Sequence, residues 1–233
     1  MENKCAFKIA DIHEFIKTLP DNSIDFIYTN PPFATTRKKW DKPLRWDELW
    51  IEIDRVLKPH GVVALHSAIP FTYDLIAVRK PKYNYNWVKK NPTNFFLAKK
   101  QPLRKMEEIL IYYKGQHTYN PQMEGDEVVK AWTRPVSKTN KNETYYGKQV
   151  ATESKERVGR YPTTYLGEFK RVTQKTSPKS VPKEIEEKMI KTYSNENDLI
   201  LDMTCCDRQL GELAVSLKRN YIGVDISNEF LKL

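Results

Sequence analysis

Apolar and polar positions along the chain change their period several times, and this pattern predicts strands that alternate with helices. Residues 6–9 alternate, residues 12–19 carry apolar side chains at helical spacing, and Pro20-Asp21-Asn22 breaks that helix. Residues 24–29, IDFIYT, form a largely apolar run, which is typical of a strand buried on both faces of a parallel sheet. Residues 44–57 have the pattern of an amphipathic helix that ends at Lys58-Pro59-His60-Gly61.

The rest of the chain continues the alternation, with one interruption. Further strands are predicted at residues 62–68, 107–115, 198–204 and 221–227, and further helices at residues 183–194 and 211–220. This order predicts an α/β fold with an open, mostly parallel, Rossmann-like sheet and helices on both faces. Residues 115–176 show little periodicity, so we expect either a small insertion at the sheet's edge or a long functional loop. The expected boundaries are 1–114 and 177–233 for the two halves of the sheet domain and 115–176 for the insertion.

Composition narrows the class of protein. The chain has 233 residues, 39% hydrophobic and 30% charged, which suits one folded core. It has no apolar run long enough to cross a bilayer and no signal-peptide pattern at its start, so we expect no membrane partner. Three cysteines, two of them adjacent, form neither a disulfide framework nor a metal-binding spacing, and no metal is expected. A reducing, cytoplasmic setting is the expectation.

The net charge of +9 is concentrated in one segment. Residues 79–105 contain nine Lys or Arg residues and no acid, with Tyr, Trp and Phe residues interleaved. One interpretation is a solvated basic face. The aromatic residues and the length of the run favour the other interpretation, a surface that follows the phosphates of a nucleic acid.

Two strand ends near the C-terminus indicate a nucleotide-like cofactor. Asp202 ends one predicted strand and Asp225 ends the next, 23 positions later, where an acid commonly holds ribose hydroxyls. An Asp at a strand end is also a common helix cap. The intervening turn lacks the expected glycines, since Cys206 and Arg208 stand in their places. We expect Arg208 to resist a left-handed backbone conformation, because its side chain makes φ > 0 costly.

The tetrapeptide Asn30-Pro31-Pro32-Phe33, which follows a buried strand, has chemistry suited to an aromatic amine. The Asn30 side chain and the Pro31 carbonyl can accept both N–H groups of a nucleobase amine, while the prolines fix the backbone and add no competing donor. Phe33 can stack on a base, and the basic residues that follow can hold flanking phosphates. The alternative is an ordinary turn after a strand, since Asn-Pro initiates turns.

These features together resemble the beta-class amino-methyltransferases of DNA, in which the catalytic motif comes early and the cofactor turn late. The resemblance covers nearly the whole chain and is carried by ADIHEFIKTLPDNSIDFIYTNPPF, RVLKPHGVV, WVKKNPTNFFLAKKQPLRKMEEILIYYKG, RYPTTYLGEF and SPKSVPKEIEEKMIKTYSNENDLILD. The chain departs from the family in its glycine-free late turn and at Ser177–Pro182, where the family usually has His-Pro-Thr-Gln-Lys-Pro. These departures put the affinity for the cofactor in question.

The resemblance implies transfer of a methyl group from S-adenosylmethionine to a flipped adenine in double-stranded DNA, because Asn at the head of the motif favours adenine over cytosine. It implies that Asn30, Pro31, Pro32 and Phe33 are catalytic. The cofactor would be held by Asp11, Ser180, Asp202, Thr204, Cys206, Asp225 and Ile226. DNA would be held by Arg37, Lys38, Lys39, Trp40, Lys89, Lys90, Lys99, Lys100, Arg134, Lys138 and Arg160, with residues 115–176 as a target-recognition insertion.

The resemblance places the protein in a restriction-modification setting, in a bacterium or a phage, and leaves open a homodimer or a partner restriction enzyme. Two other functions remain as alternatives. One is a DNA-binding subunit that has lost catalysis together with the glycines of its cofactor turn. The other is an amine methyltransferase of RNA or protein, because Asn-Pro-Pro-Phe also serves those substrates.

Overall fold

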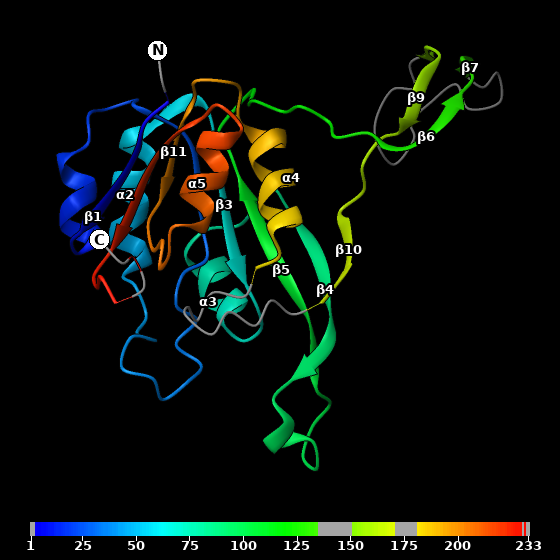
Figure 1. Ribbon diagram of the computed structural model, residues 1–233. Coiled ribbons are helices and arrows are strands. Elements are labelled where there is room, and N and C mark those ends of the chain that lie inside the picture. Colours follow the sequence, from blue (N-terminus) through cyan, green and yellow to red (C-terminus); the bar gives the residue numbers. More distant parts are fainter. Residues whose placement is uncertain (1–2, 135–150, 171–180, 230, 232–233) are drawn as a thin grey trace. The chain divides into compact units, whose positions relative to one another are not determined.

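The computed structural model describes residues 3–134, 151–170, 181–229 and 231. Contacts divide the chain into two compact units, Met1–Asn120 with Thr164–Leu233 and Pro121–Thr163. In the described part of the chain, one eight-stranded sheet has the order β1-β12-β11-β2-β3-β5-β4-β10 (Figure 1). Its strands are β1 (Cys5–Ile9), β2 (Ile24–Thr29), β3 (Leu57–Ser67), β4 (Tyr83–Thr93), β5 (Arg104–Tyr112), β10 (Tyr165–Phe169), β11 (Leu199–Asp202) and β12 (Asn220–Asp225).

The sheet is mixed but mostly parallel. The five strands from β1 to β3 are parallel neighbours, β5 is antiparallel to both β3 and β4, and β10 is parallel to β4. The predicted open, mostly parallel Rossmann-like sheet is therefore confirmed. Parallel neighbours bring their carboxyl ends to one edge, and this edge is where open α/β sheets bind ligands.

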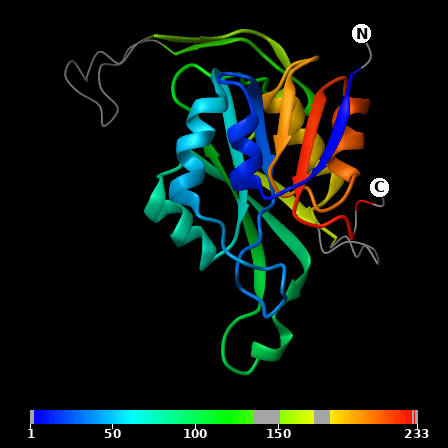
Figure 2. The same ribbon diagram turned by 90° about the vertical axis from the view of Figure 1, so that its left-hand side faces the viewer.

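Helices cover both faces of the sheet (Figures 1 and 2). Strand residues alternate between two apolar cores: Phe26 and Tyr28 face one, while Ile27 between them faces the other. The first core is closed by α4 (Lys183–Tyr193) and α5 (Gln209–Ser216). The second is closed by α1 (Ile12–Phe15) with the short η1 (Ile16–Thr18), α2 (Trp46–Val56) and α3 (Phe71–Val78).

Two local expectations were wrong. The helix ends before Lys58 as expected, but the next strand begins earlier than the expected residue 62, because β3 already starts at Leu57. Leu57 pairs with Ile24, and the Lys58 ammonium lies 2.8 Å from both carboxylate oxygens of the buried Asp25, which keeps this segment extended. The basic run 79–105 is not one surface, since it contains β4, whose Tyr85 and Trp87 are buried in the first core.

The second unit consists of short antiparallel pairs. In its described residues, β6 (Glu124–Val129) pairs with β9 (Arg157–Arg160), and β7 (Trp132–Arg134) pairs with β8 (Thr152–Ser154). This unit is shorter than the 115–176 region that lacks periodicity in the sequence. The difference arises because residues 165–169 form β10, which extends the main sheet beside β4.

Candidate active site

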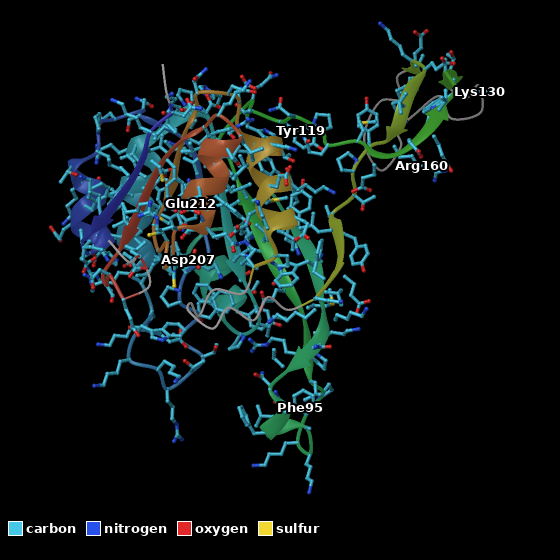
Figure 3. The ribbon with its side chains drawn as sticks, viewed as in Figure 1. Phe95, Tyr119, Lys130, Arg160, Asp207 and Glu212 are labelled. Carbon is cyan, nitrogen blue, oxygen red and sulfur yellow. The ribbon has the colours of Figure 1, made fainter. Side chains whose placement is uncertain are left out.

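Four polar residues follow the carboxyl ends of four neighbouring strands. Asp11 lies just after β1, Asp225 ends β12, Asp202 ends β11 and Asn30 follows β2. Because these strands are parallel neighbours, all four residues lie at one edge of the sheet. Figure 3 marks Asp207 and Glu212, which lie in the turn after β11 and on α5. The residues that the sequence placed at two separate motifs therefore share one site.

The Asn30–Phe33 tetrapeptide packs against the core and is partly exposed to solvent. Pro31 is buried, whereas Asn30, Pro32 and Phe33 are half-buried. The Phe33 ring stacks on the buried Phe71 of α3, with 5.1 Å between ring centroids and 19° between planes. One face of Phe33 therefore packs on the second apolar core.

A buried carboxylate holds the loop that leaves this tetrapeptide. Asp41, only 7% exposed, accepts hydrogen bonds from the backbone N–H groups of Ala34 (2.7 Å), Thr35 (3.0 Å) and Thr36 (2.6 Å). Ala34 has φ = 52°, the left-handed conformation that turns the chain toward Asp41. The following Arg37, Lys38, Lys39 and Trp40 are exposed. Sequence reasoning missed Asp41, since nothing in its neighbours marks it as a loop anchor.

The end of β2, just before the Asn30 tetrapeptide, contacts the turn after β11 directly. The Thr29 hydroxyl, at the end of β2, lies 2.8 Å from the Thr204 hydroxyl in the turn after β11. The Asp202 carboxylate is fully buried and accepts from the Thr204 N–H and the Tyr221 hydroxyl, both at 3.2 Å. Burial, and then the nearby Asp202 charge, raise the pKa of Tyr221 well above its ordinary value, so the phenol stays a donor. Asp202 therefore holds the turn in shape.

Only one of the two residues that replace glycines has a glycine-like backbone. Cys206 has φ = 58° and donates its backbone N–H to Asp225 Oδ2 at 2.9 Å. Arg208 has φ = −88°, so the expected strain at this position was wrong. Its guanidinium lies 5.1 Å from the centroid of the Phe7 ring of β1. It also lies 3.3 Å from Glu212 Oε1 on α5.

Two acids at the ends of the neighbouring strands β12 and β1, Asp225 and Asp11, have spare acceptor capacity. Asp225 accepts one backbone N–H on each oxygen, from Cys206 (2.9 Å) and Ser227 (2.9 Å). Asp11 Oδ1 accepts the His13 backbone N–H at 2.8 Å and lies 2.9 Å from the His13 ring. These contacts, the backbone one first, lower the pKa of Asp11 and keep it ionised. Ile226, next to Asp225, is 73% exposed at the same edge.

The expected DNA-binding cations divide into exposed and engaged groups. Lys90, Lys99 and Lys100 are exposed. The expectation for Lys89 was wrong: it is 6% exposed and forms an ion pair with Glu107 on the neighbouring strand β5. Arg160 of the second unit lies 3.3 Å from Glu127, with both side chains exposed.

Three expected site residues lie at the end of a described segment or outside the described residues. Arg134 is known here only as the last residue of β7. Ser180 and Lys138 lie outside the described residues. Within the described ranges, no three His, Cys, Asp or Glu side chains gather as metal ligands would, and no helix has the length and apolar character to cross a membrane.

Comparison with known proteins gives one family across most of the chain. A family model described as DNA methylase (N6_N4_Mtase) matches residues 24–233. The type II methyltransferase M.HpaI of Haemophilus parainfluenzae is 25% identical and aligns with 94% of this chain and 69% of its own. The DNA adenine methyltransferase YhdJ of Escherichia coli (strain K12) is also 25% identical, with 94% of this chain and 77% of its own aligned.

Solved structures have the same fold. The M1.HpyAVI–SAM complex matches with a TM-score of 0.64 and 21% identity, over 97% of this chain and 95% of that one. The PvuII DNA methyltransferase, described as cytosine-N4-specific, matches with a TM-score of 0.65 and 13% identity, over 98% of this chain and 86% of that one.

Proposed function

The chain belongs to the DNA methylase family, whose members methylate DNA with S-adenosylmethionine as the methyl donor, and we propose that it methylates the exocyclic amine of adenine after that base has been flipped out of the duplex. The observation that carries this proposal is the position of Asn30. This side chain follows β2 at the edge of the sheet where Asp202, Asp225 and Asp11 also lie. An amine acceptor and a nucleotide-binding set are therefore neighbours.

The tetrapeptide would hold the amine by its two hydrogens. The Asn30 side-chain oxygen and the Pro31 backbone oxygen accept one N–H each, and neither proline has an N–H that would compete. With both hydrogens held, the nitrogen lone pair can point toward the methyl donor. The face of Phe33 opposite Phe71 would stack on the purine. Because the amine becomes acidic only as the new bond forms, positioning supplies most of the rate and the proton leaves to solvent.

The residues around the late turn fit S-adenosylmethionine, which supplies an electrophilic methyl group when bound. Each oxygen of Asp225 accepts one backbone N–H, and a carboxylate has about four acceptor positions, so the remainder can receive the ribose hydroxyls. Exposed Ile226 gives an apolar surface for the adenine ring, and Asp11 stands on the adenine side. The backbone of the turn at Thr204 and Cys206, fixed by the buried Asp202, would hold the methionine portion.

The preference for adenine follows from Asn30 at the head of the motif. The cationic loop Arg37–Trp40 would hold phosphates beside the flipped base, and the second unit, with Arg134 and Arg160, would read base edges in the major groove. Both assignments are proposals about this chain's own residues.

The test is modified-base sequencing of DNA from cells that express the chain, together with transfer assays on purified protein. We expect N6-methyladenine at one short sequence. Asn30→Ala should reduce transfer by two orders of magnitude or more while DNA binding stays within about twofold. Asn30→Asp, which keeps the acceptor, should retain measurable transfer. Modified cytosine instead of adenine would overturn the base assignment, and methylation of RNA or protein without methylation of DNA would overturn the substrate.

A further inference from the structure

The connection between β4 and β5 ends in a tip that carries two exposed phenylalanines. The tip contains η2 (Phe95–Leu97) and begins at Asn94, which has φ = 70°. Phe95 is 65% exposed and Phe96 is 93% exposed. Figure 3 shows Phe95 at the projecting end of this hairpin, away from the sheet. Solvent-exposed aromatic rings at a projecting point are a feature of binding surfaces rather than of structural loops.

The tip is ordered by its own backbone. Leu97 N–H donates to Asn94 O (2.9 Å), Ala98 N–H to Phe95 O (3.1 Å) and Lys100 N–H to Leu97 O (2.8 Å). The two rings are therefore presented by a short hydrogen-bonded turn that exists before any partner arrives. A preformed turn loses little conformational entropy on binding, so an exposed ring on it can contribute more of its contact energy.

The charge around the rings selects the partner. Lys90, Lys99 and Lys100 are exposed, and among the described residues none of the three has an acidic side chain within ion-pair distance. No acid occurs anywhere in residues 79–105. Aromatic rings within an unneutralised cationic tip match a nucleic acid, where bases stack on the rings and phosphates contact the ammonium groups.

The topology places the tip at the catalytic edge. β4 is antiparallel to β5, β5 is antiparallel to β3, and β3 is parallel to β2, so β4 ends at the same edge as β2. Both the tip and the loop after Asn30 project beyond that edge in the two ribbon views (Figures 1 and 2). DNA that presents a base to Asn30 therefore lies at the edge from which Phe95 and Phe96 project.

We propose that Phe95 and Phe96 form an apolar wedge that inserts against the base steps flanking the target, while the lysines of the same tip hold the adjacent phosphates. This inference rests on the proposed function, because it takes duplex DNA as the partner. It adds a contact that unstacks or bends the duplex away from the target base. The rings and the lysines thereby have separable effects, since stacking responds weakly to salt and phosphate contacts respond strongly.

The test compares two double variants of the full chain, Phe95→Ala/Phe96→Ala and Lys99→Ala/Lys100→Ala, with Ile51→Ala as control. Ile51 is an exposed apolar residue on α2, 71% exposed, and its loss should change nothing. Binding to duplex DNA is measured by fluorescence anisotropy at several salt concentrations. We expect the phenylalanine variant to bind roughly tenfold more weakly or worse, as for the loss of one base–aromatic stack, with an unchanged salt slope. The lysine variant should lose about one unit of slope per phosphate contact.

A second readout locates the wedge. Duplexes with 2-aminopurine placed in turn at each position around the target should brighten at a flanking step with the wild-type chain and with the lysine variant, but not with the phenylalanine variant. Wild-type affinity and unchanged brightening in the phenylalanine variant would overturn the inference, even if the chain methylates DNA. Absence of methylation with the wedge effects intact would instead overturn the proposed activity alone.

Two other partners are outcomes of the same variants. Loss of self-association in sedimentation, with unchanged DNA binding, would make the tip a contact between copies of the chain. Loss of binding to phosphatidylserine-containing vesicles, with unchanged DNA binding, would make it a membrane contact. Either result overturns the wedge.

Discussion

Replacement of Asp41 by Asn should slow methyl transfer without weakening DNA binding. The Asp41 carboxylate accepts three consecutive backbone N–H groups, from Ala34 at 2.7 Å, Thr35 at 3.0 Å and Thr36 at 2.6 Å. An Asn side chain has one oxygen, which can serve Thr35 and Thr36, and its NH₂ group would then face the Ala34 N–H donor to donor. Ala34 directly follows the Asn30–Phe33 tetrapeptide, so the lost hydrogen bond loosens the backbone next to the proposed base pocket.

The size of the effect follows from these contacts. A hydrogen bond to a charged group contributes about 1.5–3 kcal/mol, and a neutral one about half of that. Asp41→Asn removes one such bond and makes two others neutral, which amounts to roughly 3–6 kcal/mol of loop stabilisation. If all of it served to hold the tetrapeptide in its reactive geometry, transfer would slow by about 150- to 25,000-fold. We expect at least a tenfold decrease, because part of the loss is absorbed by local rearrangement of an otherwise exposed loop.

The assay is single-turnover transfer to a duplex that contains the recognised site, with enzyme in excess, together with DNA affinity measured without cofactor. Asp47→Asn is the matched control, because it makes the same change of charge at an exposed position in the first turn of α2. Transfer by Asp41→Asn within twofold of the wild-type rate would refute the positioning role. A loss of DNA affinity as large as the loss of rate would show that Asp41 acts through binding instead.

Three further predictions follow from single contacts. Cys206→Gly should raise the melting temperature by about 1–4 °C. A left-handed φ of 58° costs a Cys roughly 1–2 kcal/mol, and the greater conformational freedom of Gly in the unfolded chain offsets part of the gain. A lower melting temperature would contradict this. Lys90→Ala should reduce the salt slope of DNA binding by about one unit, whereas Lys89→Ala should leave the slope unchanged and lower stability, since it strands the buried Glu107. Asp11→Asn should lower the free energy of unfolding in denaturant titrations at neutral pH, and the difference from wild type should vanish on acidification. The pKa of Asp11 in the folded chain is lowered from 3.8. The stabilisation by its ionised form is therefore complete above pH 3.8 and disappears as the pH falls through the folded-state pKa. A difference that persists in acid would assign the effect to geometry rather than to ionisation.

The parallel half of the sheet could be predicted from the sequence because its signals are local. Residues 24–29 are mostly apolar, and all six are buried in β2. Strand β4 carries the opposite kind of signal. Tyr85, Trp87 and Lys89 share one face, and the lysine is buried because it pairs with Glu107 on β5, 18 positions away. A partner at that separation depends on the register of the two strands, so the basic composition of residues 79–105 alone predicts one exposed surface.

The candidate site divides in the same way. The placement of Asn30 and Asp225 at one edge of the sheet could be predicted because each follows or ends a strand with a clear sequence pattern, and parallel strands end together. Asp41 could not, because its three donors depend on the left-handed turn at Ala34, and alanine gives no sign of such a turn in a sequence. The Thr29–Thr204 hydroxyl contact joins positions 175 residues apart and likewise exists only in the folded chain.

The late turn shows why the absence of a glycine motif is a weaker argument than its presence. Glycines in such turns meet two separate requirements, a left-handed backbone position and room for a helix to approach a strand. Here Cys206 occupies the left-handed position. The room is supplied by Gly211, where a Cβ would lie 2.8 Å from Cys5 Sγ and from the Tyr221 ring. Neither requirement applies at Arg208, so the size of its side chain does not obstruct the turn. The backbone N–H of Cys206 still reaches Asp225, so within this turn the missing glycines leave backbone strain at Cys206, which Cys206→Gly measures as a change in melting temperature.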